Sequence, residues 1–157
     1  MLYFSEMKKF YYILPLVFTT LLFSCSQKRI MNIEEIPLPP EAKQGTIDGR
    51  YEVELDGATN AILSDLKKTY GKTEEKILFL PGEAGAAKIF EFYAPKLAEK
   101  GFSKDANVPL NNRNYQLNVW RSDGWLGGQA VAVAVIDAGK DAEGKPTKFL
   151  AVYSAEK

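Results

Sequence analysis

The stretch "QAVAVAVID", residues 129–137, contains the alternation that decides the fold. In an extended strand, successive side chains point to opposite faces of the sheet, so the valines share one face and the alanines share the other. No charged residue precedes Asp137 in this stretch, which predicts a strand that is covered on both faces. Because alanine is small, a helix can approach the alanine face closely.

Three further segments predict strands around residues 129–137. The stretches "YQLNVWR" (115–121) and "KFLAVYS" (148–154) are rich in β-branched and aromatic residues. The linker 138–147 is rich in turn-forming residues and predicts an antiparallel hairpin between 129–137 and 148–154. The stretch "KILFL" (76–80), which is apolar after Lys76, is typical of a central strand.

The first half of the chain predicts one more strand and two helices. The hexapeptide "RYEVEL", residues 50–55, alternates apolar and charged side chains and predicts a half-buried strand. One helix is expected from Asp56, a potential N-cap, to Gly71, and a second from the "PGEAG" turn at 81–85 to Gly101. Their apolar stripes consist of Ile62, Leu63, Leu66 and Tyr70 in the first helix and of Ile89, Phe90, Tyr93 and Leu97 in the second.

These elements follow the order β-α-β-α-β-β-β. Pro95 lies inside the second helix, where its ring predicts a kink or a restart. The order predicts a single α+β domain with a mostly antiparallel five-stranded sheet and two helices packed on one face.

Composition excludes several kinds of chemistry. The chain has no histidine and one cysteine, Cys25, which excludes Ser-His-Asp and Cys-His nucleophiles, imidazole-bound metals and an intrachain disulfide. Basic and acidic residues balance at 20 each, and this balance lacks the basic excess typical of nucleic-acid binding. The acidic loop 137–144 does not have the spacing of a calcium-binding EF-hand and is interpreted as a solvated hairpin. We therefore assign no catalytic residue, metal ligand or cofactor.

Residues 1–24 have the pattern of a secretory leader. Lys8 and Lys9 precede an uncharged, mostly apolar run of 15 residues that reaches Ser24. A bilayer-spanning helix needs about 20 residues, so the run is more typical of a leader than of a membrane anchor. Met7 is an alternative start, because "MKKF" makes a better basic region than the residues before it. An uncleaved anchor and secretion with a free thiol remain the alternatives.

The end of this run, Leu22-Phe23-Ser24-Cys25, resembles the lipobox of bacterial lipoproteins. The resemblance implies cleavage before Cys25, a diacylglyceryl group on its sulfur and a mature protein that is held to a membrane by its lipid. Ser26 and Gln27 follow, and the lack of aspartate there implies transport to the outer membrane, on its periplasmic or its surface face.

The mature chain divides into a tether and a domain. Residues 25–45 include three prolines, and we expect an extended tether between the lipidated cysteine and a domain at 46–157. The pieces "IPLPPEA" (36–42) and "FYAPKLAEKGF" (92–102) resemble segments of small, mostly uncharacterised α+β lipoprotein domains, and this likeness implies no activity.

Exposed aromatic residues are the candidates for binding. Trp125 and Leu126 lie in a glycine-rich turn, and Trp120 points away from Leu117 and Val119 on its strand. Trp125 and Leu126 either fold back onto the core or form a contact surface for a partner or a glycan, and Trp120 is assigned to the same contact surface. The sequence thus predicts a lipid-anchored cell-envelope protein with a small binding or scaffolding domain, whose partner is another envelope protein. A carrier of small ligands and a carboxylate-based hydrolase are the alternatives.

Overall fold

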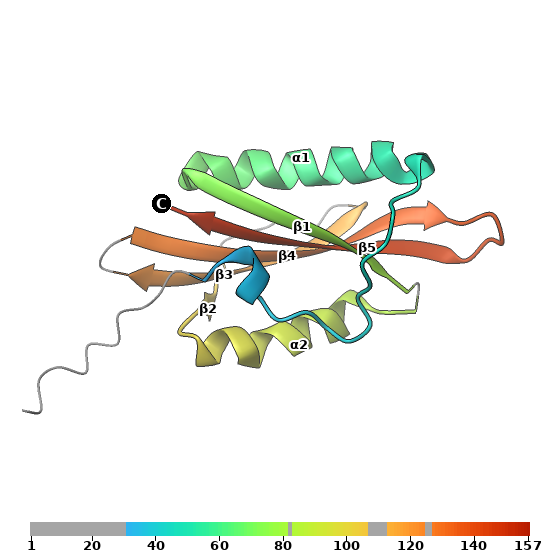
Figure 1. Ribbon diagram of the computed structural model, residues 1–157. Coiled ribbons are helices and arrows are strands. Elements are labelled where there is room, and N and C mark those ends of the chain that lie inside the picture. Colours follow the sequence, from blue (N-terminus) through green and yellow to red (C-terminus); the bar gives the residue numbers. More distant parts are fainter. Residues whose placement is uncertain (1–30, 82, 107–112, 125–126) are drawn as a thin grey trace, which may run out of the picture.

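The computed structural model describes residues 31–81, 83–106, 113–124 and 127–157, which form one α+β domain (Figure 1). Its elements are α1 (Glu52–Thr69), β1 (Lys72–Leu80), α2 (Ala86–Glu99), β2 (Ser103–Lys104), β3 (Tyr115–Gly124), β4 (Gly127–Lys140) and β5 (Pro146–Glu156). Two short 3-10 turns, η1 (Ile33–Glu35) and η2 (Gly49–Tyr51), precede α1. The strands form one antiparallel sheet in the order β1-β5-β4-β3-β2. Among these described elements, no helix is long and apolar enough to cross a membrane.

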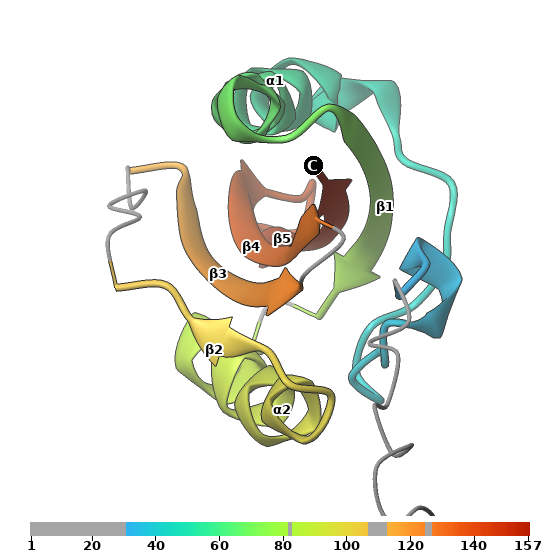
Figure 2. The same ribbon diagram turned by 90° about the vertical axis from the view of Figure 1, so that its left-hand side faces the viewer.

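The alternation in β4 organises the two layers of core. Its alanines at 130, 132 and 134 lie in one core cluster with the apolar side of α1. Its valines at 131, 133 and 135 lie in the other cluster with α2. Figure 2 shows the two helices on opposite sides of the sheet. The predicted antiparallel sheet with two helices is confirmed, but the placement of both helices on one face is wrong, because a strand that is apolar on both faces needs cover on each.

The segment predicted as the first strand belongs to α1. Residues 49–51 form η2 and Glu52–Leu55 form the first turn of the helix. The alternation in this segment is misleading, because Val53 is 78% exposed whereas Leu55 is buried. Leu55 begins a helical stripe that continues through Ala58, Ile62 and Leu66. The fifth strand of the sheet is instead the two-residue β2, which the sequence pattern did not predict.

β1 is an edge strand and not a central one, contrary to the expectation from its apolar run. Leu78 and Leu80 face the α2 side of the sheet, and Ile77 packs against the α1 side. Residues of this strand thus contribute to both layers of the core, and this explains why residues 77–80 of an edge strand are all apolar.

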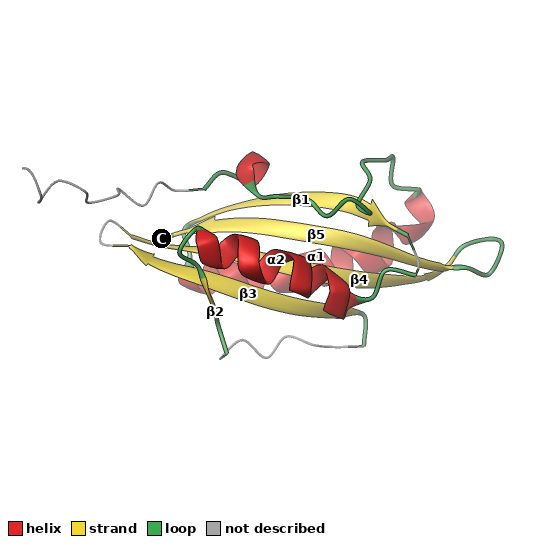
Figure 3. Ribbon diagram, turned by 90° about the horizontal axis from the view of Figure 1, so that it is seen from below, coloured by secondary structure: helices red, strands yellow, loops and turns green. Residues whose placement is uncertain are grey.

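The segment predicted as a tether is part of the fold from residue 31 onward. Met31 and Ile36 are buried beside β1 and β5, on the sheet face that α2 covers. Lys43 exchanges two backbone hydrogen bonds with Phe79 on the outer edge of β1, at 2.8 and 2.9 Å. Figure 3 shows the segment running along the outer side of β1. The folded domain therefore includes residues 31–45, which lie before the predicted boundary at residue 46, and the segment covers an edge that would otherwise be open to other chains.

α2 continues through Pro95 as one helix, so of the two expected effects of this proline, a kink or a restart, the restart does not occur. The helix ends as predicted at Gly101, whose φ of 83° lies in the left-handed region that favours glycine. The amide of Phe102 donates to the carbonyl of Leu97 at 2.9 Å and closes the end of the helix.

The close approach of α1 to the alanine face gives a testable consequence. We expect Ala132→Leu to lower the free energy of unfolding by about 1–3 kcal/mol, because the added carbons have no space between β4 and α1. Urea denaturation followed by circular dichroism measures this change. The same substitution at exposed Ala61 on α1 is the control, and it is expected to change stability by less than about 0.5 kcal/mol. Equal effects at the two sites would contradict the packing described here.

Candidate functional site

A cleft of about 340 Å³ lies between the sheet and the segment that leads from the edge of β1 to α1. Its lining consists of residues 43–48, Arg50, Tyr51, Ile77, Phe79 and Phe149. Phe79 near the end of β1 and Phe149 near the start of β5 are paired in the sheet. The cleft therefore belongs to the end of the domain at which α1 begins.

Aromatic rings form the floor of the cleft. Phe149 is buried and contacts the rings of Tyr51 and Phe79 edge to face, with centroid distances of 5.7 and 6.0 Å. Phe79 is 41% exposed, and only Phe79 and Val53 are exposed large hydrophobic residues among those that the structure describes. Such a half-open aromatic ring offers apolar contact area at a low cost in side-chain entropy.

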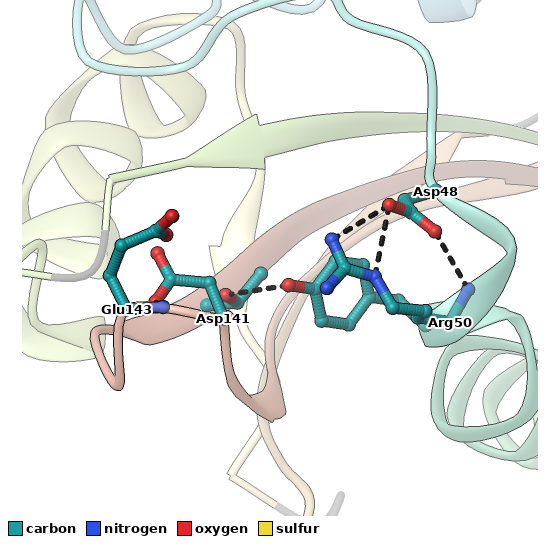
Figure 4. Close-up of polar contacts among 6 residues, drawn as sticks. Asp48, Arg50, Asp141 and Glu143 are labelled. Atoms are coloured by element: carbon teal, nitrogen blue, oxygen red, sulfur yellow. Dashed lines mark hydrogen bonds and ion pairs between the residues drawn. The ribbon is translucent and has the colours of Figure 1, made fainter.

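An ion pair lies at the rim of the cleft (Figure 4). The Nε and Nη2 atoms of Arg50 donate to Oδ2 of Asp48 at 3.0 and 2.8 Å, and the Arg50 amide donates to Oδ1 at 3.0 Å. The guanidinium also lies 5.6 Å from the centre of the Tyr51 ring. The hydrogen bonds from Arg50 lower the pKa of Asp48 below its ordinary value. Asp48 is thus held in the ionised form, which is the opposite of what a general acid requires.

The β4–β5 hairpin carries further carboxylates toward this ion pair. Asp141 accepts hydrogen bonds from the amides of Glu143 and Lys145 at 3.0 and 2.8 Å, so its carboxylate holds the turn together. Asp48 raises the pKa of Arg50 most, and the charge of Glu143 adds a smaller contribution. The Thr147 hydroxyl donates to the Tyr51 hydroxyl at 3.3 Å. Within the described residues, no three or more acidic or cysteine side chains are arranged to hold a metal ion.

This arrangement can bind an apolar group and a polar group at the same time. The floor of Tyr51, Phe79 and Phe149 provides apolar area, while Lys43 and the Asp48–Arg50 pair provide charges of both signs at the rim. Pockets that bind small molecules have volumes of about 300–1,000 Å³, so the cleft lies at the lower end of this range. A small ligand or one or two side chains of a partner protein would fill it.

Trp120, one of the predicted contact residues, does not line the cleft. Trp120 is 2% exposed and packs between Phe90 and Tyr93 of α2, with centroid distances of 6.5 and 6.3 Å. Its assignment to a surface for a partner is therefore wrong, because the face of β3 that points away from α1 is covered by α2. Trp125, Leu126 and the lipidation candidate Cys25 lie outside the described residues.

Sequence reasoning did not find Phe79 or Arg50. In a strand, Phe79 lies on the opposite face from its neighbours Leu78 and Leu80, which are both buried. The alternation of a strand is therefore the signal that could have distinguished Phe79 from the core residues beside it. The tripeptide Asp48-Gly-Arg50 contains an acidic and a basic residue on either side of a glycine, which is a weak signal for a local ion pair. Comparison with protein families, curated proteins and solved structures finds no match for this chain.

Proposed function

We propose that the protein is a lipid-anchored bacterial cell-envelope protein whose α+β domain is a binding module. The anchor is supported by the basic and apolar leader and by the lipobox-like Leu22-Phe23-Ser24-Cys25. Two acyl chains bind a membrane stably, whereas one chain binds it only marginally. The outer membrane is the favoured location, because no aspartate follows Cys25.

Metabolic labelling tests the anchor. Cells that express the full chain with labelled palmitate are expected to give a labelled, membrane-bound protein, and Cys25→Ala is expected to abolish both the label and the attachment. Label that persists in the Cys25→Ala variant would refute lipidation at this residue.

The observation that carries the binding role is the exposed ring of Phe79 in the aromatic floor of the cleft. An apolar side chain held open in a cleft is what a partner side chain or ligand can cover. The charged rim of Lys43, Asp48 and Arg50 adds groups that can orient the bound molecule. We propose another envelope protein as the partner.

Substitution of Phe79 is expected to abolish most of this binding. We expect Phe79→Ser to lower the yield of a specific crosslinked partner about tenfold or more, because loss of a central aromatic contact typically costs 2 kcal/mol or more. The measurement is mild crosslinking of membranes, solubilisation in detergent, and purification of the tagged full chain.

Val53→Ser is the matched control for this experiment. Val53 is also an exposed large hydrophobic residue but does not line the cleft. Circular dichroism confirms that each variant is folded. If both variants lose the partner equally, or both keep it, the cleft is not the binding site.

The volume of the cleft favours one second candidate, a carrier of small ligands. Native mass spectrometry of protein purified from the envelope would then show a bound non-protein mass that is lost in Phe79→Ser and kept in Val53→Ser. A spectrum of ligand-free protein would favour the protein partner.

A further inference from the structure

The first described residue of the chain is held tightly at one end of the sheet. The Met31 amide donates to Oε1 of Gln129 at 3.0 Å, and Nε2 of Gln129 donates back to the Met31 carbonyl. The Ser154 hydroxyl donates to the same carbonyl at 3.2 Å and accepts from Gln129 at 3.0 Å. All three residues are buried. This group, which we call the Met31 clamp, fixes the chain where β4 begins and β5 ends.

The clamp lies close to the proposed lipid anchor along the chain. Only residues 26–30 separate Cys25 from Met31. A fully extended chain spans at most about 3.6 Å per residue, so the six steps from Cys25 to Met31 cover at most about 22 Å. A lipid on Cys25 therefore holds this end of the sheet close to the headgroups.

The cleft lies toward the opposite end of the sheet. Phe149 on its floor precedes Ser154 of the clamp by five positions of β5, which is about 17 Å of strand. The β4–β5 hairpin with Glu143 lies beyond the start of β5 at Pro146, or more than about 26 Å from Ser154. Figure 1 shows this hairpin at the far end from the C-terminus.

Charge differs between the two ends. Exposed lysines lie at the clamped end: Lys67 and Lys68 in the last turn of α1, Lys72 at the start of β1, and Lys157 beside Gly128. Lys68 and Lys72 form ion pairs with Asp65 and Glu74, and Glu156 also faces Lys72 across the sheet. The positive charge of this end is therefore carried mainly by Lys67 and Lys157, for which the structure gives no ion pair among the described residues. The first turn of α1 at the other end carries Glu52 and Glu54. α2 carries Lys96 in its last turn and Lys88 near its start, and both helices end at the clamped end (Figure 1).

We propose that the clamped end, with Lys67, Lys68, Lys72 and Lys157, lies against a surface of anionic lipid headgroups, so that the cleft points away from the membrane. The proposal rests on lipidation of Cys25, which brings this end to the bilayer. The short chain before Met31 limits the distance, and the lysines select the side of the domain that turns toward negative charge.

Fluorescence quenching in membranes tests this orientation. Lipidated protein is reconstituted into phosphatidylglycerol vesicles that contain a headgroup quencher. Because lipidation consumes the thiol of Cys25, one introduced cysteine takes the fluorophore specifically. We expect a label at Thr69→Cys, which is exposed at the clamped end, to be quenched severalfold more than a label at Glu143→Cys in the far hairpin. Equal quenching at both sites, or stronger quenching at residue 143, would overturn the proposal.

Flotation of the vesicles distinguishes a failure of the proposed lipid anchor from a failure of the proposed orientation. Protein that does not float with the vesicles disproves the anchor itself, whereas floating protein with equal quenching disproves only the orientation.

A longer linker distinguishes the effect of the lysines on the orientation from the effect of the short chain before Met31. Insertion of about 20 Gly/Ser residues between residues 30 and 31 keeps the anchor but frees the domain to rotate. The difference in quenching is then expected to persist in phosphatidylglycerol vesicles and to disappear in phosphatidylcholine vesicles. It is also expected to disappear in Lys67→Glu/Lys157→Glu and to remain in the control Lys140→Glu/Lys145→Glu, which changes the same charge in the far hairpin. No dependence on lipid charge or on these lysines would refute the headgroup contact.

Discussion

Raising the pH above 10 is expected to unfold the domain, because two tyrosines are buried in their neutral form. Tyr93 faces the α2 layer and Tyr153 the α1 layer, and both are 0% exposed. Burial raises the pKa of each hydroxyl well above its ordinary value of 10.0. Above pH 10 the unfolded chain loses these protons and the folded domain keeps them, so stability is complete below pH 10 and falls as pH rises.

The expected loss is about 1.4 kcal/mol per pH unit for each tyrosine, or about 2.7 kcal/mol for the two together. At pH 12 this amounts to about 5 kcal/mol, which equals the whole stability of many small domains. Urea denaturation at a series of pH values between 8 and 12 measures the slope.

Tyrosine-to-phenylalanine substitutions separate the two contributions. Neither hydroxyl has a hydrogen-bond partner among the residues that the structure describes, so Tyr93→Phe and Tyr153→Phe are expected to cost nothing at pH 7. Each variant is expected to reduce the slope above pH 10 by about 1.4 kcal/mol per pH unit, the share of one tyrosine. Part of the slope remains in the double variant, because burial also raises the pKa of Tyr70 and Tyr115. A double variant with the slope of the parent would contradict this assignment.

The strands of the sheet could be predicted because their patterns are local. The alternation of small and branched residues at 129–137 and the turn residues that follow it predict β4 and its hairpin with β5, and both are confirmed. The failure at residues 50–55 has a local cause as well. Six alternating residues fit a strand or the start of a helix, and only the stripe from Leu55 to Leu66 decides between them.

The face of the sheet that each helix covers could not be predicted from the helices themselves. Both helices have one apolar stripe, and either stripe could pack on either face. The information lies in β4, whose two apolar faces each need a cover. The path of residues 31–43 depends on distant residues in the same way, since Met31 finds its partner Gln129 98 positions away.

The candidate site shows the same limit. Trp120 is the larger aromatic residue and its alternation with Val119 is correct, yet its face is buried under α2. Phe79 is half open because residues 44–48 leave the edge of β1 after Lys43 and line the cleft beside the Phe79 ring on the way to α1. Exposure of an aromatic residue thus depends on whether a distant segment covers it. The periodicity of the local sequence contains no information about the path of that segment.

Loss of the Met31 clamp is expected to release the N-terminal segment from the sheet. Gln129→Ala removes the partner of the Met31 amide and one of the two donors to the Met31 carbonyl, in a buried site. An unpaired buried polar group costs about 1–3 kcal/mol, and the truncated side chain leaves a cavity. We therefore expect the free energy of unfolding to fall by about 2–4 kcal/mol, measured by urea denaturation.

Ser154→Ala is the matched control, because it leaves the Met31 amide paired and Gln129 still donates to the Met31 carbonyl. Its expected cost is about 1 kcal/mol. Hydrogen exchange separates local release from global loss of stability: in Gln129→Ala the amides of residues 31–43 are expected to exchange faster than those of β4 and β5. If Gln129→Ala costs no more than Ser154→Ala, the clamp does not hold the segment. The apolar contacts of Met31 and Ile36 alone would then keep it on the sheet.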